Sequence, residues 1–155
     1  TPAMVHYYFG GKEGLLRAVF DNAFTPLLTK LDEPSTLEEW VTLFHEHILA
    51  RRWMPHLMLR EVIMDGGHLR EHFTAQYAPR VIAKWMDLFS HEKQEGRMRD
   101  DANDLRHAVL MMAMLVYPFV IAPLSGILTD TPFSDDEMRN FRADALHLFF
   151  CGAKG

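Results

Sequence analysis

Apolar residues recur every three to four positions along most of this chain, which is the spacing of one face of an α-helix. Two such stripes are formed by Leu15/Leu16, Val19/Phe20, Ala23, Leu27/Leu28 and Leu31, and by Leu37, Trp40, Val41, Phe44 and Ile48. The sequence contains no alternating strand pattern, GxGxxG loop, P-loop or internal repeat. It therefore predicts an all-α protein.

Capping residues, glycines and prolines mark where these helices begin and end. Thr1 and Pro2 are typical of a helix start, and the Gly10–Gly11 pair is typical of a helix end. Two Ser-x-x-Glu sequences, each a capping box, open later helices. The predicted helical segments in the first half of the chain are 2–9, 12–31 with a kink at Pro26, one opened by Ser35 and Glu38, and one from Pro55 to about Gly67. Those in the second half are 68–95 with a bend at Pro79, 101–122, and one opened by Ser134 and Glu137 that ends near Gly152. Residues 129–133 are expected to form a loop.

The charge and cysteine counts exclude several classes of protein. The chain has 155 residues with 16 Lys+Arg, 21 Asp+Glu and one cysteine, for a net charge of −5. One cysteine excludes an internal disulfide framework and a multi-cysteine zinc site. The negative balance argues against a protein that coats nucleic acid through its bulk charge. The length suits one domain, or one domain with a small fragment.

The longest apolar stretch, 108–124, is 17 residues long and contains Pro118 and Pro123. That length is at the low end for a membrane span, so we predict a buried helix in a cytoplasmic protein without a membrane partner. A membrane protein, which would need detergent for extraction, remains an alternative. The chain opens at Thr1–Pro2 without an initiator Met or a signal segment, and we expect its native N-terminus to be missing.

The first sixteen residues, TPAMVHYYFGGKEGLL, combine a short capped helix, a glycine turn and a lysine at the start of a longer helix. Small, polar and aromatic side chains of the short helix can reach base edges, thymine methyls and phosphates. Val5 and Phe9, four residues apart, are the apolar pair expected to fasten this helix to its neighbours. Lys12 and the N-terminus of the following helix are suited to phosphate contact. These features are those expected at the end of a DNA-reading unit.

In this order of features, the segment resembles the end of the helix-turn-helix of TetR-family transcriptional regulators. The resemblance implies that 1–31 is the C-terminal part of a DNA-binding domain, containing the recognition and connecting helices, and that 32–155 is an effector-binding and dimerisation domain. It departs from the family where His6 replaces the usual tyrosine and where two preceding helices are absent. An alternative is that the aromatic run is a core cluster of an unrelated helical bundle. By the resemblance, the DNA-contacting residues are Thr1, Pro2, Ala3, Met4, His6, Tyr7, Tyr8 and Lys12.

The remainder of the chain matches the family by helix layout only. Residues 1–30 have a net charge of +1 and 31–155 a net charge of −6, as expected if the body does not touch DNA. A helical effector domain should enclose a mostly apolar pocket with a few polar groups, suited to a hydrophobic or aromatic ligand. Candidate pocket residues are Trp40, Phe44, His47, Leu57, Arg60, Glu61, Met64, Phe73, Tyr77, Ile82, Trp85, Met86, Phe89, Met111, Met114, Leu115 and Tyr117; each of them is otherwise explained as core packing.

The two C-terminal helices have more apolar surface than one chain can easily bury. A two-fold four-helix interface solves this problem, and the resemblance implies the same homodimer. Candidate interface residues are Leu105, Phe141, Ala145, Leu148 and Phe149. The resulting hypothesis is a repressor that is released from a palindromic operator by a small effector. A helical small-molecule-binding or scaffold protein that does not read DNA is the alternative.

The sequence gives little support to the hypothesis that the chain is an enzyme. Phe44-His45-Glu46-His47 is not an HExxH motif, because its two histidines fan around the helix. Asp104-x-x-His107 and Asp144-x-x-His147 lack the glutamates of a di-iron bundle. Cys151 has no histidine partner expected from the sequence and is interpreted as packing. We expect no enzyme, no metal and no cofactor.

Overall fold

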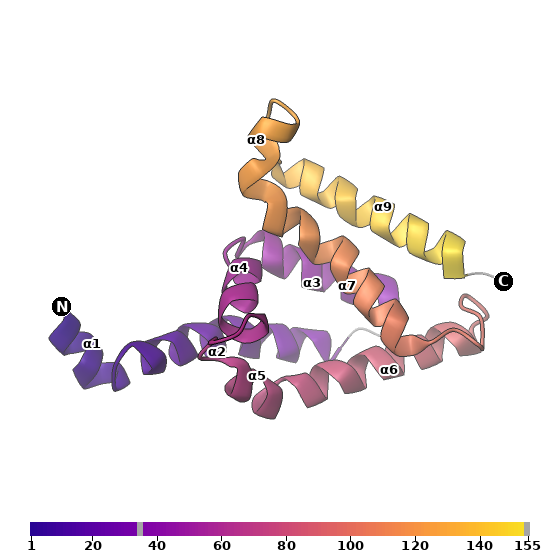
Figure 1. Cartoon of the computed structure of the whole chain (residues 1–155). Coiled ribbons are helices and arrows are strands. Elements are labelled where there is room, and N and C mark those ends of the chain that lie inside the picture. Colours follow the sequence, from indigo (N-terminus) through magenta and orange to yellow (C-terminus); the bar gives the residue numbers. More distant parts are fainter. Residues whose placement is uncertain (34–35, 154–155) are drawn as a thin grey trace.

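The computed structural model describes residues 1–33 and 36–153, and this part of the chain is all-α, as predicted. Figure 1 shows α1 and the first half of α2 projecting from a body made by the other helices, with the two termini at opposite ends. The elements are α1 Pro2–Phe9, α2 Lys12–Leu31, α3 Leu37–Leu49, α4 Met54–Met58, η1 Leu59–Ile63, α5 Arg70–Gln76, α6 Ala78–Gln94, α7 Asp104–Ile121, η2 Ala122–Leu124, α8 Ser125–Leu128 and α9 Asp135–Ala153.

The N-terminal helix begins and ends where its sequence predicts. The side chain of Thr1 accepts a hydrogen bond from the backbone N–H of Met4, and Pro2 occupies the first turn. Gly10 ends the helix at φ 72°, a left-handed conformation that favours glycine. Neither Val5 nor Phe9 is buried, so the expected apolar fastening of α1 is wrong for the described residues.

The helix α3 confirms the predicted apolar stripe, because all five of its predicted residues are buried. Its capping box differs from the prediction. Thr36 accepts a hydrogen bond from the N–H of Glu39, whose carboxylate accepts one from the N–H of Thr36. Ser35, the predicted cap, lies outside the described residues. The cap at α9 agrees with the prediction, since Ser134 Oγ accepts from the N–H of Glu137.

The predicted single helix over 68–95 is wrong. The structure has two helices, α5 and α6, which meet at Tyr77, with Pro79 in the first turn of α6. Proline has no N–H to continue the preceding helix, so a break shortly before it satisfies the backbone. The predicted helix from Pro55 is also divided, into α4 and the π-helical turn η1.

The apolar helix α7 is only partly the buried helix that its sequence predicted. Ala108, Met111, Leu115 and Phe119 face the core, whereas Leu105, Val109, Leu110 and Tyr117 are exposed. The segment Asp104–Leu128 is long and apolar enough to cross a membrane by length and composition; an 18-residue window within it has a mean hydropathy of 2.1, and one third of that window is buried. Helix α7 has α9 beside it, and α8 forms the projecting tip in Figure 1.

Candidate functional site

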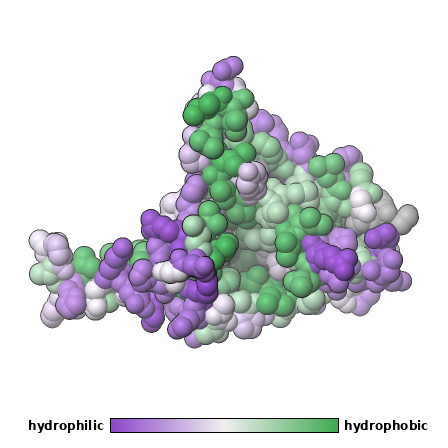
Figure 2. Space-filling model, viewed as in Figure 1, coloured by the Kyte–Doolittle hydropathy of each residue, from purple (hydrophilic) through white to green (hydrophobic). Residues whose placement is uncertain are grey.

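An apolar cavity of about 400 Å³ lies inside the body, between α2, α3, α4, η1, α5, α6 and α7. Figure 2 shows a hollow between α4 and α7 bordered by hydrophobic surface. This volume falls in the range of small-molecule sites. The lining residues are Phe24, Leu27, Leu28, Leu31, Trp40, Phe44, Ile48, Met54, Pro55, Met58, Leu59, Ile63, Phe73, Val81, Met112, Ala113, Val116, Tyr117 and Val120.

Four of the candidate pocket residues line this cavity, namely Trp40, Phe44, Phe73 and Tyr117. The other apolar candidates lie elsewhere, because neighbouring positions on a helix face different directions. Trp85, Phe89, Met111 and Leu115 are core residues, Leu57, Met86 and Met114 pack against the core from its edge, and Met64 and Ile82 are exposed.

Sequence reasoning missed most of the cavity wall. The α2 residues Leu27, Leu28 and Leu31 belong to the predicted apolar stripe, but nothing local indicated which element they would meet, and Phe24 was not predicted. The α7 residues Met112 and Val116 lie one position away from the predicted Met111 and Leu115. The sequence shows which residues of a helix share an apolar face, but it does not show toward which neighbouring helix that face points.

The candidates Arg60 and Glu61 do not line the cavity. Glu61 is 6 % exposed and accepts hydrogen bonds from Arg60 Nε at 2.8 Å and from the N–H of His68 at 3.3 Å; His68 Nδ1 lies 3.1 Å from the carboxylate. Burial by itself would raise the pKa of Glu61, but the hydrogen bonds from His68 and Arg60 outweigh it and lower the pKa. A Cβ on Gly67 would lie 2.3 Å from the Glu61 carbonyl oxygen, so this turn requires glycine. The cluster holds the connection between η1 and α5.

The candidate His47 is buried outside the cavity lining and joins two helices. Its Nε2 donates to the carbonyl of Ala23 in α2 at 2.9 Å, and Arg51 lies 3.4 Å from its Nδ1. Burial is the main cause that lowers the pKa of His47. His47 therefore acts as a tie between α3 and α2.

A polar cluster joins α2 to α5 and to the start of α6. His72 Nε2 donates to Asp21 Oδ1 at 2.6 Å, and the hydroxyl of Tyr77 donates to the same oxygen. Thr25 Oγ1 lies 3.4 Å from the Tyr77 hydroxyl. Burial, followed by the hydrogen bond to Asp21, raises the pKa of Tyr77. The candidate Tyr77 thus belongs to this cluster.

Aromatic rings connect the polar cluster to the cavity. Phe20 and Phe24 stack with ring centroids 4.3 Å apart, and Tyr77 packs edge-on against both. Phe73 also meets Phe24 edge-on, at 5.8 Å. Because Phe24 and Phe73 line the cavity, the same ring cluster borders the cavity and contacts Tyr77 of the Asp21–His72–Tyr77 group.

The predicted DNA-contacting residues are all exposed in the structure. Thr1 is the N-cap of α1, Lys12 is the first residue of α2, and the others lie on α1: Pro2, Ala3, Met4, His6, Tyr7 and Tyr8. Tyr7 is 83 % exposed, and the rings of Tyr7 and Tyr8 meet edge-on. Helix α1 has no buried residue in the structure and extends away from the body (Figure 1).

The predicted interface residues divide between an outer groove and the core. The groove between α7 and α9 is lined by Phe141, Ala145 and Leu148 together with Ala113, Met114, Tyr117, Pro118 and Asp144. Leu148 is 63 % exposed and Leu105 is exposed further along α7. Phe149 is 6 % exposed and stacks on Phe89, so it belongs to the core of its own chain.

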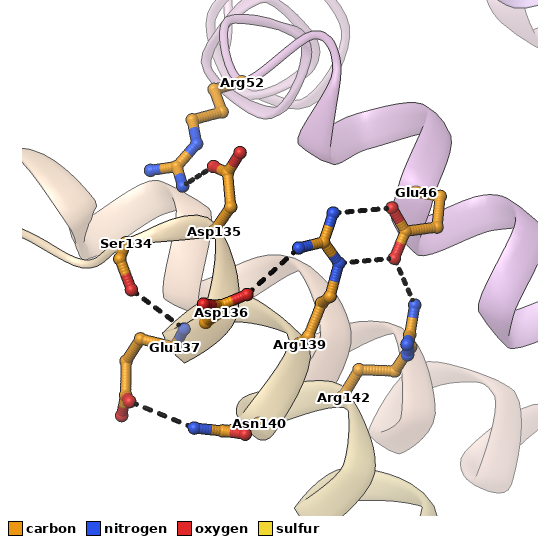
Figure 3. Close-up of polar contacts among 9 residues, drawn as sticks. All are labelled: Glu46, Arg52, Ser134, Asp135, Asp136, Glu137, Arg139, Asn140 and Arg142. Carbon is orange, nitrogen blue, oxygen red and sulfur yellow. Dashed lines mark hydrogen bonds and ion pairs between the residues drawn. The ribbon is translucent and has the colours of Figure 1, made fainter.

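Two arginines of α9, Arg139 and Arg142, form ion pairs with Glu46 of α3 and hold the two helices together (Figure 3). Arg139 contacts the two carboxylate oxygens of Glu46 at 3.1 and 3.3 Å, and Arg142 contacts Glu46 at 2.7 Å. The hydrogen bond from Arg139 is the main cause that lowers the pKa of Glu46. Arg52, in the turn after α3, pairs with Asp135 at 2.5 Å (Figure 3).

His45 precedes Glu46 in α3, and the centroid of its ring lies 5.2 Å from that of Phe119 in α7. Its Nδ1 is buried with no hydrogen-bond partner among the residues that the structure describes. Burial lowers the pKa of His45 from 6.5 to about 4, and the positive charge of Arg142 contributes. The packed bundle therefore holds a neutral histidine at this position.

Within residues 1–33 and 36–153, no group of three or more His, Cys, Asp and Glu side chains could hold a metal ion. Cys151 is exposed, and its Sγ lies 3.7 Å from His147 Nε2. The chain matches no family model, no curated protein and no solved structure.

Proposed function

We propose that the chain is a TetR-family, ligand-responsive DNA-binding transcriptional regulator, a cytoplasmic homodimeric repressor released from its operator by a hydrophobic effector. The observation that carries the proposal is the course of α2. Its first residue follows the turn after the exposed helix α1, and its second half supplies Phe24, Leu27 and Leu28 to the wall of the apolar cavity. One helix thus joins a surface suited to DNA with an interior suited to a ligand.

The surface of α1 supports recognition of double-stranded DNA. A helix of this width fits the major groove, where small and aromatic side chains reach base edges and thymine methyls. Tyr7 and Tyr8 are exposed and available for bases or phosphates, and Lys12 is exposed beside the N-terminal amides of α2. These residues belong to α1 and to the first turn of α2, the part of the chain that projects from the body (Figure 1).

The contacts of α2 supply a route by which an effector would act. A ligand in the cavity touches Phe24 and Phe73, whose rings pack around Tyr77 and so meet the Asp21–His72–Tyr77 cluster. A ligand that prefers one orientation of α2 over another shifts the equilibrium between them, and with it the position of α1.

The α7–α9 groove supports a two-fold dimer. Its exposed apolar residues would be buried between α7 and α9 of two copies in a four-helix arrangement. Such a dimer presents two α1 helices, which must lie about 34 Å or a multiple of it apart to read a palindrome.

The proposal is tested by selecting double-stranded DNA from a random library with the full-length protein. We expect enrichment of an inverted repeat whose half-sites are separated by whole helical turns. Lys12→Ala should weaken binding to the selected site, whereas Lys30→Ala, an exposed lysine at the far end of α2, should leave it unchanged. Failure of the wild-type protein to enrich any sequence would overturn the regulator.

A helical small-molecule-binding protein that does not read DNA is the second candidate, and the cavity favours it as much as it favours a regulator. Ligand binding without DNA enrichment would support this candidate. The apolar segment Asp104–Leu128 keeps a membrane protein as a third outcome. Recovery of the protein from cells without detergent would exclude it.

A further inference from the structure

We propose that the cavity selects uncharged ligands with an apolar body and one polar group at the outer end, next to Tyr117. This inference rests on the proposed function in taking the cavity as the effector site, and it adds the chemical class of the effector. It excludes carboxylates and ammonium compounds, which the Arg60–Glu61 pair would otherwise have suggested as ligands.

The first observation is the composition of the wall. Of the lining side chains, Trp40 and Tyr117 are the two that contain a nitrogen or oxygen atom, and none contains a formal charge at neutral pH. A charged ligand would therefore lose its hydration without meeting a counterion, which is strongly unfavourable. An uncharged ligand gains from apolar burial against methionine and aromatic side chains.

The second observation is that the polar and charged residues predicted to line a pocket, Arg60, Glu61 and His47, have other hydrogen-bond partners. Glu61 is buried among Arg60 and His68, and Arg60 is exposed on the outer side of the π-helical turn. His47 donates to the carbonyl of Ala23. Turning any of them toward the cavity would break these hydrogen bonds, so none is free to neutralise a ligand.

The third observation concerns the two polar atoms of the wall. Trp40 Nε1 is buried and has no hydrogen-bond partner among the residues that the structure describes, and its ring contacts those of Phe44 and Trp85. Tyr117 is 61 % exposed, and its hydroxyl makes no hydrogen bond with any residue that the structure describes. Tyr117 also lines the α7–α9 groove, so it stands at the boundary between the cavity and the outside. A hydroxyl or carbonyl of the ligand can form a hydrogen bond with this phenol, while the apolar body fills the interior.

Four compounds with one ring system test the inference: 2-naphthalenemethanol, 2-methylnaphthalene, 2-naphthoate and 2-naphthylmethylammonium. Each competes at pH 7.5 with Nile red, a neutral fluorescent probe, for binding to the wild-type chain. We expect the two neutral compounds to displace Nile red at concentrations at least tenfold lower than the two ions. Displacement by either ion at an equal or lower concentration overturns the inference, as does absence of Nile red binding to the wild type.

Two valines of α7 locate the binding site. Val116→Trp fills the cavity and should weaken Nile red binding at least tenfold, whereas Val109→Trp adds the same volume at an exposed position outside the lining and should have no effect. Equal effects of the two variants would place the probe elsewhere and overturn the inference. Circular dichroism checks folding, and Val120→Phe, a smaller addition to the same wall, replaces Val116→Trp if that variant is unfolded.

Tyr117→Phe tests the polar end. Loss of one hydrogen bond should weaken the binding of 2-naphthalenemethanol about three- to tenfold and leave 2-methylnaphthalene unchanged. An equal effect on both compounds would show that Tyr117 does not bind the polar group of the ligand and would overturn that part of the inference. These assays contain no DNA, so neutral-ligand selectivity together with a failed DNA selection would overturn the regulator and retain the ligand class.

Discussion

His72 of α5 donates a hydrogen bond to Asp21 of α2 at 2.6 Å, across 51 residues of sequence. Tyr77 donates to the same carboxylate oxygen, so one acidic group on α2 holds the junction between α5 and α6. This group lies beside aromatic rings that line the cavity, and it is the polar link between the arm and the body that sequence reasoning did not foresee.

Asp21→Asn should loosen this link. The variant keeps the size of the side chain and removes the negative charge of the carboxylate that accepts both hydrogen bonds. Because Asp21 is partly exposed, we expect a loss of about 1 kcal/mol in the free energy of unfolding. Urea denaturation measures it. Asp101→Asn, at an exposed aspartate, is the control. Equal stability of the two variants would show that the Asp21 cluster contributes nothing to the fold.

His45 should make the protein less stable in mild acid. Its pKa is about 4 in the folded chain and 6.5 in the unfolded chain, so the unfolded chain binds more protons between these values. Above pH 6.5 the titration of His45 does not reduce the free energy of unfolding. Between pH 6.5 and pH 4 it lowers the free energy of unfolding by at most about 1.4 kcal/mol per pH unit. The lowered pKa of His47 contributes a loss of the same sign.

Urea midpoints at pH 7.5, 6.5, 5.5 and 4.5 test this dependence. His45→Gln removes the titrating group and should flatten the decline, whereas His56→Gln, at an exposed histidine, should not. Identical pH profiles for wild type and His45→Gln would contradict the assignment.

Glu61→Gln should destabilise the connection between η1 and α5. The carboxylate is buried and accepts hydrogen bonds from Arg60 and His68, and hydrogen bonds to a charged group contribute more than neutral ones, so we expect a loss of about 2 kcal/mol. Glu71→Gln, at an exposed glutamate in α5, is the matched control. Thermal unfolding of the two variants compares them, and a smaller loss for Glu61→Gln than for Glu71→Gln would be inconsistent with the cluster.

Leu148→Arg should separate the proposed dimer. Light scattering after size exclusion should give twice the chain mass of 18.0 kDa for the wild type and the chain mass for the variant, because burying an unpaired arginine from each copy in the interface is unfavourable. Ile82→Arg, at an exposed position of α6 outside the groove, should stay dimeric. A monomeric wild type would overturn the dimer itself.

Local signals in the sequence were sufficient for most helix ends. The Thr1 cap, the Gly10 stop and the Ser134 cap act through hydrogen bonds or backbone conformations within a few residues, so they can be recognised without tertiary structure. The break at Tyr77 shows the limit of this reasoning, because Pro79 permits either a bend or a break. The contact of Tyr77 with Asp21, 56 residues away, accompanies the break in the folded chain.

The sequence by itself determined that this chain is all-α, since the spacing of its apolar residues defines one helical face after another. It also determined which face of α3 is buried. Only the tertiary structure decided which helices surround the cavity, and that Glu61 pairs with His68 instead of a ligand. The reason is physical: helical periodicity is set by the backbone within one turn, whereas the direction in which a face points depends on packing between segments far apart in the chain.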